Sequence, residues 1–252
     1  MKIITILCFF ICFGQIGFTQ SKFIDSLSKK LSIATDDKSK VLLLSEIGFY
    51  YRLSKPDTAF ALGQKALAMA QKINFPQGES NALSTLAATY SILGDLQNAM
   101  LYCFKSISIA QKYDFKDELS KGYLIMGGSY SSLKEYDLGI KYLKSTIEIR
   151  KTFDDKEIYA TAIANLGETY LRKNQLDSAL IYLHQANDLM MHVKNSPILG
   201  FTHSRMAATY LKLKHYDTAY AYIIKAIEIS KKGKNIRGQC IGNQILAKYL
   251  KT

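Results

Sequence analysis

The chain has 252 residues, 48% of them hydrophobic, so it is long and apolar enough to bury a continuous core, which excludes a disordered chain. Its 33 Lys and Arg residues outnumber its 21 Asp and Glu residues, giving a formal net charge of +12. A charge of this size suits an acidic protein, a membrane surface or nucleic acid as partner, or simply a solvated basic surface.

Residues 1–19 have the layout of a signal peptide. Lys2 precedes an apolar run from Ile3 to Phe13, and the small residues Gly17 and Thr19 come before a polar segment. The run is shorter than the roughly 20 residues that span a bilayer as a helix, which favours a cleaved signal over an anchor. We therefore expect an exported protein, periplasmic or secreted from a bacterium.

Export narrows the choice of partners. Nucleic acid is not expected, because an exported protein rarely meets it. Membrane attachment is expected only if the signal segment stays uncleaved or if a membrane helix follows downstream. The remaining expectation is a protein or peptide partner, and an acidic one would match the basic chain.

Residues 20–37 are predicted to form an N-terminal capping helix. Phe23, Ile24, Leu27 and Leu31 fall on one face of a helix. This apolar face is expected to cover the first of the units that follow.

Residues 38–232 repeat with a period of 40. Residues 86–99 read LAATYSILGDLQNA and residues 206–219 read MAATYLKLKHYDTA. The same spacing separates Tyr90, Tyr130, Tyr170 and Tyr210. A second tyrosine series keeps the same period at Tyr102, Tyr142, Tyr182 and Tyr222. Repetition at 20 to 50 residues is typical of a solenoid.

Each unit is predicted to be a helix hairpin. Within a unit the apolar residues follow helical spacing, stop at a short break such as Leu93-Gly94-Asp95, and then resume. The prolines Pro56, Pro76 and Pro197 all fall at predicted breaks, where a missing N–H does least harm. The pattern predicts an all-α α-solenoid of antiparallel hairpins.

Five units resemble tetratricopeptide (TPR) repeats, in which a large apolar residue, a small residue, a Tyr and then an Ala recur. The matching residues are Ile47-Gly48-Tyr51-Ala59, Leu86-Ala87-Tyr90-Ala99, Met126-Gly127-Tyr130-Gly139, Leu166-Gly167-Tyr170-Ala179 and Met206-Ala207-Tyr210-Ala219. Small residues let the paired helices approach, and the Tyr ring fills the space beside them. A TPR period is 34, so the longer unit predicts a deeper groove. HEAT repeats have a similar period of about 40 but lack this signature.

Residues 236–252 are predicted to form a C-terminal helix. Ile241, Ile245, Leu246 and Tyr249 resemble the beginning of another first helix. This helix is either a solvating cap, in which case a monomer is expected, or the start of a sixth repeat. Whether Thr252 is a natural end or a truncation stays open.

No group of residues predicts an enzyme, a metal site or a cofactor. His184, Asp188 and His192 share a helix face, but without a further ligand motif a solvated stripe is the better interpretation. His203 occupies a position that is apolar in other units, which predicts a half-buried structural histidine. The sequence lacks nucleophile and phosphate-binding motifs.

The resemblance to TPR repeats implies that binding occurs on the concave face, which the first helices form. Helical projection predicts a lining that is small and uncharged in the early units and mostly basic in the later ones. The predicted peptide-binding residues are Asn81, Ser84, Lys121, Asn165, Glu168, Arg172, Arg205 and Lys212. We expect an extended peptide or a helix, anchored near Asn165, Arg172 and Arg205.

Two functions are compatible with these patterns. The first is an exported, non-enzymatic scaffold for protein–protein interaction. The alternative is based on the export signal, the leading helix and the long units, which resemble the periplasmic segment of bacterial signalling proteins. In those proteins a histidine kinase or a helix-turn-helix regulator supplies the output, and no residue of this chain does so.

Overall fold

The computed structural model describes residues 18–193, 196–232 and 236–250. Within these residues the chain forms twelve helices and no strand, which confirms the predicted all-α solenoid. The helices are α1 (Phe18–Ile33), α2 (Asp37–Tyr51), α3 (Pro56–Lys72), α4 (Pro76–Leu93), α5 (Leu96–Lys112), α6 (Lys116–Ser132), α7 (Tyr136–Arg150), α8 (Glu157–Arg172), α9 (Leu176–Met190), α10 (Pro197–Lys212), α11 (Tyr216–Lys232) and α12 (Ile236–Tyr249).

The predicted signal peptide lies outside the described residues, except for its last two positions, where α1 begins. No helix in the described portion of the chain has both the length and the apolar character to cross a bilayer.

Small residues hold the two helices of each hairpin close together. A Cβ added to Gly127 on α6 would lie 2.6 Å from Leu143 Cγ on α7, and one added to Gly167 would lie 2.8 Å from Leu183 Cγ. Beside these contacts the two tyrosine series stack on each other, with ring centroids 5.3 Å apart for Tyr170 and Tyr182. The period-40 signature therefore encodes the packing within each hairpin.

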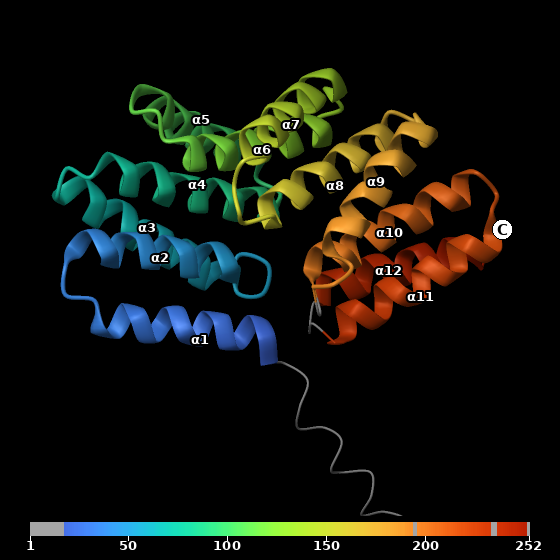
Figure 1. Ribbon diagram of the computed structural model, residues 1–252, viewed down its shortest axis with the longest axis horizontal. Coiled ribbons are helices and arrows are strands. Elements are labelled where there is room, and N and C mark those ends of the chain that lie inside the picture. The colour runs from blue at the N-terminus through green and yellow to red at the C-terminus, as the bar shows by residue number, and fades with distance from the viewer. Residues whose placement is uncertain (1–17, 194–195, 233–235, 251–252) are drawn as a thin grey trace, which may run out of the picture.

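The hairpins follow one another around an arch, with α1 at one end and α11 and α12 at the other (Figure 1). Each first helix contacts the first helix of the next unit, from α2 and α4 through to α8 and α10. Among the described residues, consecutive second helices make no such contact. Units that touch along one face and separate along the other must curve, so the first helices line the concave side.

The turns inside the second to fifth hairpins share one conformation. Gly94, Lys134, Asn174 and Lys214 all have a positive φ, between 62° and 84°. In each turn the N–H of the next residue donates to the carbonyl of the tyrosine in the first series, for example Asp95 to Tyr90 at 3.0 Å. These are Schellman caps, which satisfy carbonyls that a helix end leaves unpaired.

Two helices cover the ends of the array. Ile24 and Leu27 on α1 are buried against Ile47 of α2. At the other end Ile245 on α12 is buried against Ile223 and Ile227 of α11. Both end helices thus remove apolar surface of the outermost hairpins from water.

Candidate functional site

A cavity of about 350 Å³ opens on the concave side between α2, α4, α6 and α8. The lining combines aromatic rings, small polar residues and carboxylates from four successive first helices and the loop before α8. It consists of Leu42, Ser45, Glu46, Phe49, Tyr50, Gln77, Asn81, Ser84, Thr85, Asp117, Glu118, Lys121, Asp155, Glu157 and Ile158. We call this the N-terminal pocket.

One carboxylate of the N-terminal pocket, that of Asp117, is paired with two basic side chains of the chain itself. Asp117 lies in the first turn of α6, and its two oxygens lie 2.6 Å from Lys121 Nζ and 2.5 Å from an Arg150 guanidinium nitrogen. Burial by itself raises the pKa of Asp117, but the two cations outweigh it and hold that pKa below its usual value. Arg150 is 1% exposed and also donates to Ser120 Oγ at 2.7 Å.

The other carboxylates of the pocket have weaker partners. Glu118 is 2% exposed and accepts a 3.3 Å hydrogen bond from the Gln77 amide, and its burial raises its pKa. Burial also raises the pKa of Glu157 on α8, although the positive charge of Arg52, the C-cap residue of α2, acts in the opposite direction. Arg52 itself lies 3.6 Å from the centre of the Phe49 ring. Charges from the first and fourth units therefore act on each other across the groove.

The structure places the eight predicted binding residues in two groups. Asn81, Ser84 and Lys121 line the N-terminal pocket. Ser84 is nearly fully buried there, and its hydroxyl pairs with Ser106 Oγ at 2.8 Å. The other five lie further along the arch on α8 and α10: Asn165, Glu168, Arg172, Arg205 and Lys212.

The basic residues of the second group are held by partners within the chain. Glu168 Oε1 lies 2.8 Å from Arg172 and 3.1 Å from Arg205. Arg205 also stacks on Phe201, with its guanidinium carbon 4.7 Å from the ring centre. Lys212 Nζ donates to Asn174 Oδ1 at 3.0 Å. Much of the positive charge expected to face a ligand is thus compensated internally.

Helical projection of the sequence missed the acidic side of the N-terminal pocket. Asp117, Glu118 and Glu157 stand in the first turns of α6 and α8, where acidic residues usually compensate the helix dipole. Glu46 belongs to the first unit, in which no binding residue was predicted. The available signal was the recurrence of carboxylates at first-helix starts, but it does not reveal that these starts meet.

Two histidines, His203 and His184, are hydrogen-bonded within the fold. His203, on α10, is hydrogen-bonded as predicted, with its Nε2 2.9 Å from Asn187 Oδ1, but at 7% exposure it is more deeply buried than the half-buried position that the sequence predicted. Burial lowers its pKa to about 4. His184 Nε2 lies 3.2 Å from the Tyr210 hydroxyl. In the portion of the chain that the structure describes, no three His, Cys, Asp or Glu side chains are grouped to hold a metal ion.

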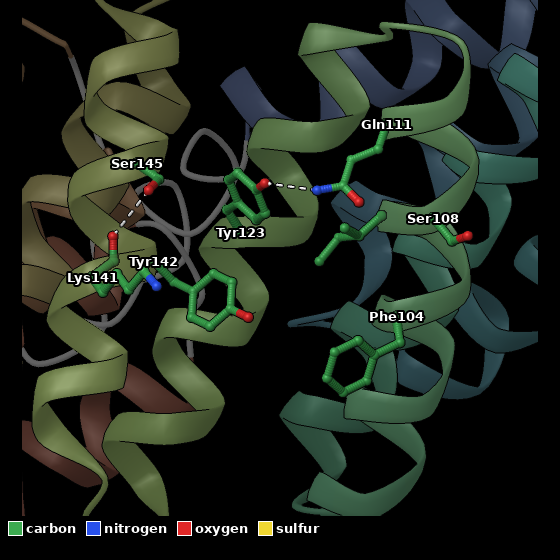
Figure 2. Close-up of a pocket in the computed structure, with 8 residues that line it drawn as sticks. Phe104, Ser108, Gln111, Tyr123, Lys141, Tyr142 and Ser145 are labelled. Atoms are coloured by element: carbon green, nitrogen blue, oxygen red, sulfur yellow. Dashed lines mark hydrogen bonds between the residues drawn. The ribbon is translucent and has the colours of Figure 1, made fainter.

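A second cavity of about 350 Å³ lies where the second helices α5 and α7 diverge. Figure 2 shows Phe104, Ser108 and Gln111 of α5 on one side of it and Lys141 and Tyr142 of α7 on the other, with Tyr123 of α6 between the two helices. The Gln111 amide donates to the Tyr123 hydroxyl at 3.1 Å (Figure 2). A gap of this kind is what the outward spread of the second helices produces.

Solved structures share this fold at low sequence identity. BtubC (BKLC) from P. vanneervenii is 18% identical with a TM-score of 0.61, over 84% of this chain and 91% of that one. A Rap protein complexed with Competence and Sporulation Factor is 15% identical with a TM-score of 0.68 over 91% of this chain, which spans only 62% of the Rap chain. NprR in complex with its cognate peptide NprX is 19% identical with a TM-score of 0.71, over 93% of this chain and 69% of NprR.

The family assignment comes from sequence models. No curated protein is significantly similar to the chain. Tetratricopeptide repeat models match residues 119–190 and residues 202–232, which correspond to segments of the third to fifth hairpins. These matches show that residues 119–190 and 202–232 form tetratricopeptide repeats, and the other hairpins share their period of 40 and their small-residue contacts.

Proposed function

We propose that this protein is an exported, non-enzymatic interaction scaffold that binds a peptide or a helix along its concave face. The observation that carries the proposal is the N-terminal pocket, a cavity of about 350 Å³ lined by four successive first helices. Clefts of about this volume that combine aromatic walls with a few polar groups are typical binding sites. An extended ligand crossing several first helices would bury more surface than one contained in a single hairpin.

Two of the structural neighbours support a peptide as ligand, since the Rap protein was solved with Competence and Sporulation Factor and NprR with its cognate peptide. Export is proposed from the sequence layout of residues 1–19. A monomer is proposed because α1 and α12 cover the two ends of the array.

Selection of random octapeptides displayed on phage against the immobilised full-length protein tests peptide binding. We expect enriched peptides that cross-link to the first helices, which are α2, α4, α6, α8 and α10, and not to the second helices. Enrichment of no peptide, or cross-links confined to the second helices, would contradict the proposal. N-terminal sequencing after expression in a bacterial host tests export, and the expected mature protein begins at Gln20.

The second candidate function is the periplasmic sensor segment of a bacterial signalling protein. Its support is that one neighbour, NprR, is described as a quorum sensor and is longer than the segment that this chain matches. Sequencing the DNA downstream of codon 252 tests it. A further helix followed by about 20 apolar codons would favour this candidate.

A further inference from the structure

The N-terminal pocket has the opposite charge to the protein that contains it. Five of its lining residues are acidic and one is basic, a formal balance of −4, whereas the whole chain carries +12. Lys121, the basic one, is held by Asp117 at 2.6 Å. A concave site lined by one sign of charge raises the local concentration of ligands of the other sign.

Most of this negative charge is not used for ion pairs inside the fold. Among the described residues, the salt bridges of the pocket involve Asp117, whereas Glu46, Glu118, Asp155 and Glu157 take part in none. Arg52, whose positive charge acts on Glu157, stacks on Phe49 and donates to the Phe49 carbonyl. The pocket therefore has several carboxylates that can each accept a further charged hydrogen bond.

An unpaired hydroxyl is an independent sign that the pocket takes a ligand. Ser45 on α2 lines the pocket and is fully buried, and its Oγ has no hydrogen-bond partner among the described residues. Its backbone carbonyl is already bonded by Thr85 Oγ1 at 3.0 Å. Buried hydroxyls in native proteins nearly always have a partner, so Ser45 Oγ is placed to bond a group that enters the pocket.

The chemistry of the walls indicates which group that is. Phe49 and Tyr50 line the pocket beside the carboxylates. Aromatic faces attract ammonium and guanidinium groups, and carboxylates bond them with charge assistance. The remaining polar lining, Asn81 and Gln77, offers amides suited to a peptide backbone.

We propose that the N-terminal pocket binds a positively charged group of a peptide, a lysine or arginine side chain or a free amino terminus, between Glu118, Glu157 and the rings of Phe49 and Tyr50. The inference rests on the proposed peptide-binding function and specifies the residue class that the groove selects. It reverses the polarity of the partner that net charge alone suggests.

Peptide titrations followed by NMR test this proposal on the purified full-length protein. The first pair is acetyl-Ala-Ala-Arg-Ala-Ala-amide and the same peptide with citrulline, which keeps the shape of arginine without its charge. We expect the arginine peptide to bind at least about tenfold more tightly, the usual value of one charge-assisted hydrogen bond. Equal affinities would overturn the proposal without any variant being needed.

Two further peptides identify the source of the charge. Acetyl-Ala-Ala-Lys-Ala-Ala-amide tests a lysine side chain, and Ala-Ala-Ala-Ala-Ala-amide with a free amino terminus tests the terminal amine. The preferred one among the three charged peptides shows which group occupies the pocket. If none of them binds better than the neutral citrulline peptide, the pocket does not select charge and the proposal fails.

Variants locate the binding to the pocket. The double substitution Glu118→Gln with Glu157→Gln is expected to weaken the arginine peptide by about tenfold or more and to leave the citrulline peptide unchanged. Glu228→Gln, on the exposed side of α11, is the matched control and is expected to change neither. Equal weakening by the control, or none by the double variant, would overturn the proposal.

The outcome separates this inference from the proposed function. If display selects peptides that bind the first helices but have no Lys, Arg or required amino terminus, the inference fails and the scaffold stands. If no peptide is selected at all, the proposed function fails and the inference fails with it.

Discussion

Two regions of the concave face differ in how their charged side chains are paired. One lies between α2 and α8 and the other along α8 and α10. In the N-terminal region Glu46, Glu118 and Glu157 have no ion-pair partner among the described residues, and Ser45 Oγ is unbonded. In the C-terminal region a single carboxylate, that of Glu168, holds both Arg172 and Arg205. The same repeat thus builds an acidic pocket with three glutamates outside ion pairs at one end, and at the other a basic surface whose arginines share one carboxylate, so net charge does not describe either region.

The largest expected effect is on stability, where removing Arg150 should cost more than removing an arginine of the C-terminal region. Arg150 is 1% exposed and bonds both Asp117 and Ser120, so Arg150→Ala leaves buried polar groups without their cation. We expect a loss of about 3 kcal/mol in the free energy of unfolding. Arg172→Ala, at a half-exposed ion pair with Glu168, is expected to cost less than about 1 kcal/mol. Urea unfolding of both variants measures the difference, and similar losses would contradict it.

Acid should act with opposite sign on His203 of α10 and on Glu118 of α6. His203 has a folded pKa of about 4, below its usual 6.5, so the unfolded chain takes up its proton first and stability is lost as pH falls through this range. Between pH 7 and pH 4 we expect His203 to lower the free energy of unfolding by about 2 to 3 kcal/mol, and His203→Gln should abolish this contribution. Urea unfolding at pH 7, 5.5 and 4 tests this expectation.

Glu118, in the N-terminal region, has a raised folded pKa, so its protonation favours the folded state as pH falls. Glu118→Gln should therefore make the loss of stability in acid larger than in the unmodified protein. If the variant instead follows the unmodified protein through the same pH series, burial of Glu118 has no effect on its titration in solution.

Glu168→Gln should increase the difference in charge between the two regions. The change removes the carboxylate that Arg172 and Arg205 share, so the surface along α8 and α10 becomes more basic. We expect a stability loss of about 1 kcal/mol and a gain in affinity for the peptide acetyl-Ala-Glu-Glu-Ala-amide. Glu135→Gln, at the turn before α7, is a control for net charge. Unchanged affinity would show that the arginines face away from the groove.

Ser45→Ala should have the smallest effect on folding. Because Ser45 Oγ is buried without a partner among the described residues, its removal is expected to leave stability unchanged or to raise it by up to about 1 kcal/mol. Binding of the arginine peptide should weaken at the same time. A stability loss above about 1 kcal/mol would mean that the hydroxyl has a partner in solution.

The sequence was sufficient for the hairpins and their order. The period of 40, the small residues at Gly127 and Gly167 and the paired tyrosines predict contacts within one unit, and the structure confirms those contacts. It was sufficient for His203 too, because a polar residue in an apolar register position must be buried and bonded. Each of these features depends on neighbours within two units.

The candidate site was less predictable. Helical projection finds residues that point to the concave side, such as Asn81 and Lys121, but it does not give their partners. It therefore treated Arg172 and Arg205 as available for a ligand, and it gave no reason to place Glu46 and Glu157 in the lining of one pocket.

What the sequence determined by itself is the repeating hairpin, because helix periodicity and the packing of adjacent helices are local properties of the chain. What only the tertiary structure decided is the charge of the groove, because the small bend between successive units adds up over several of them. That accumulated curvature brings Glu46, Glu118 and Glu157, from the first, third and fourth hairpins, to one cavity. The direct contact between the neighbouring first helices α8 and α10 sets Glu168 against Arg205, so that the basic residues there are compensated.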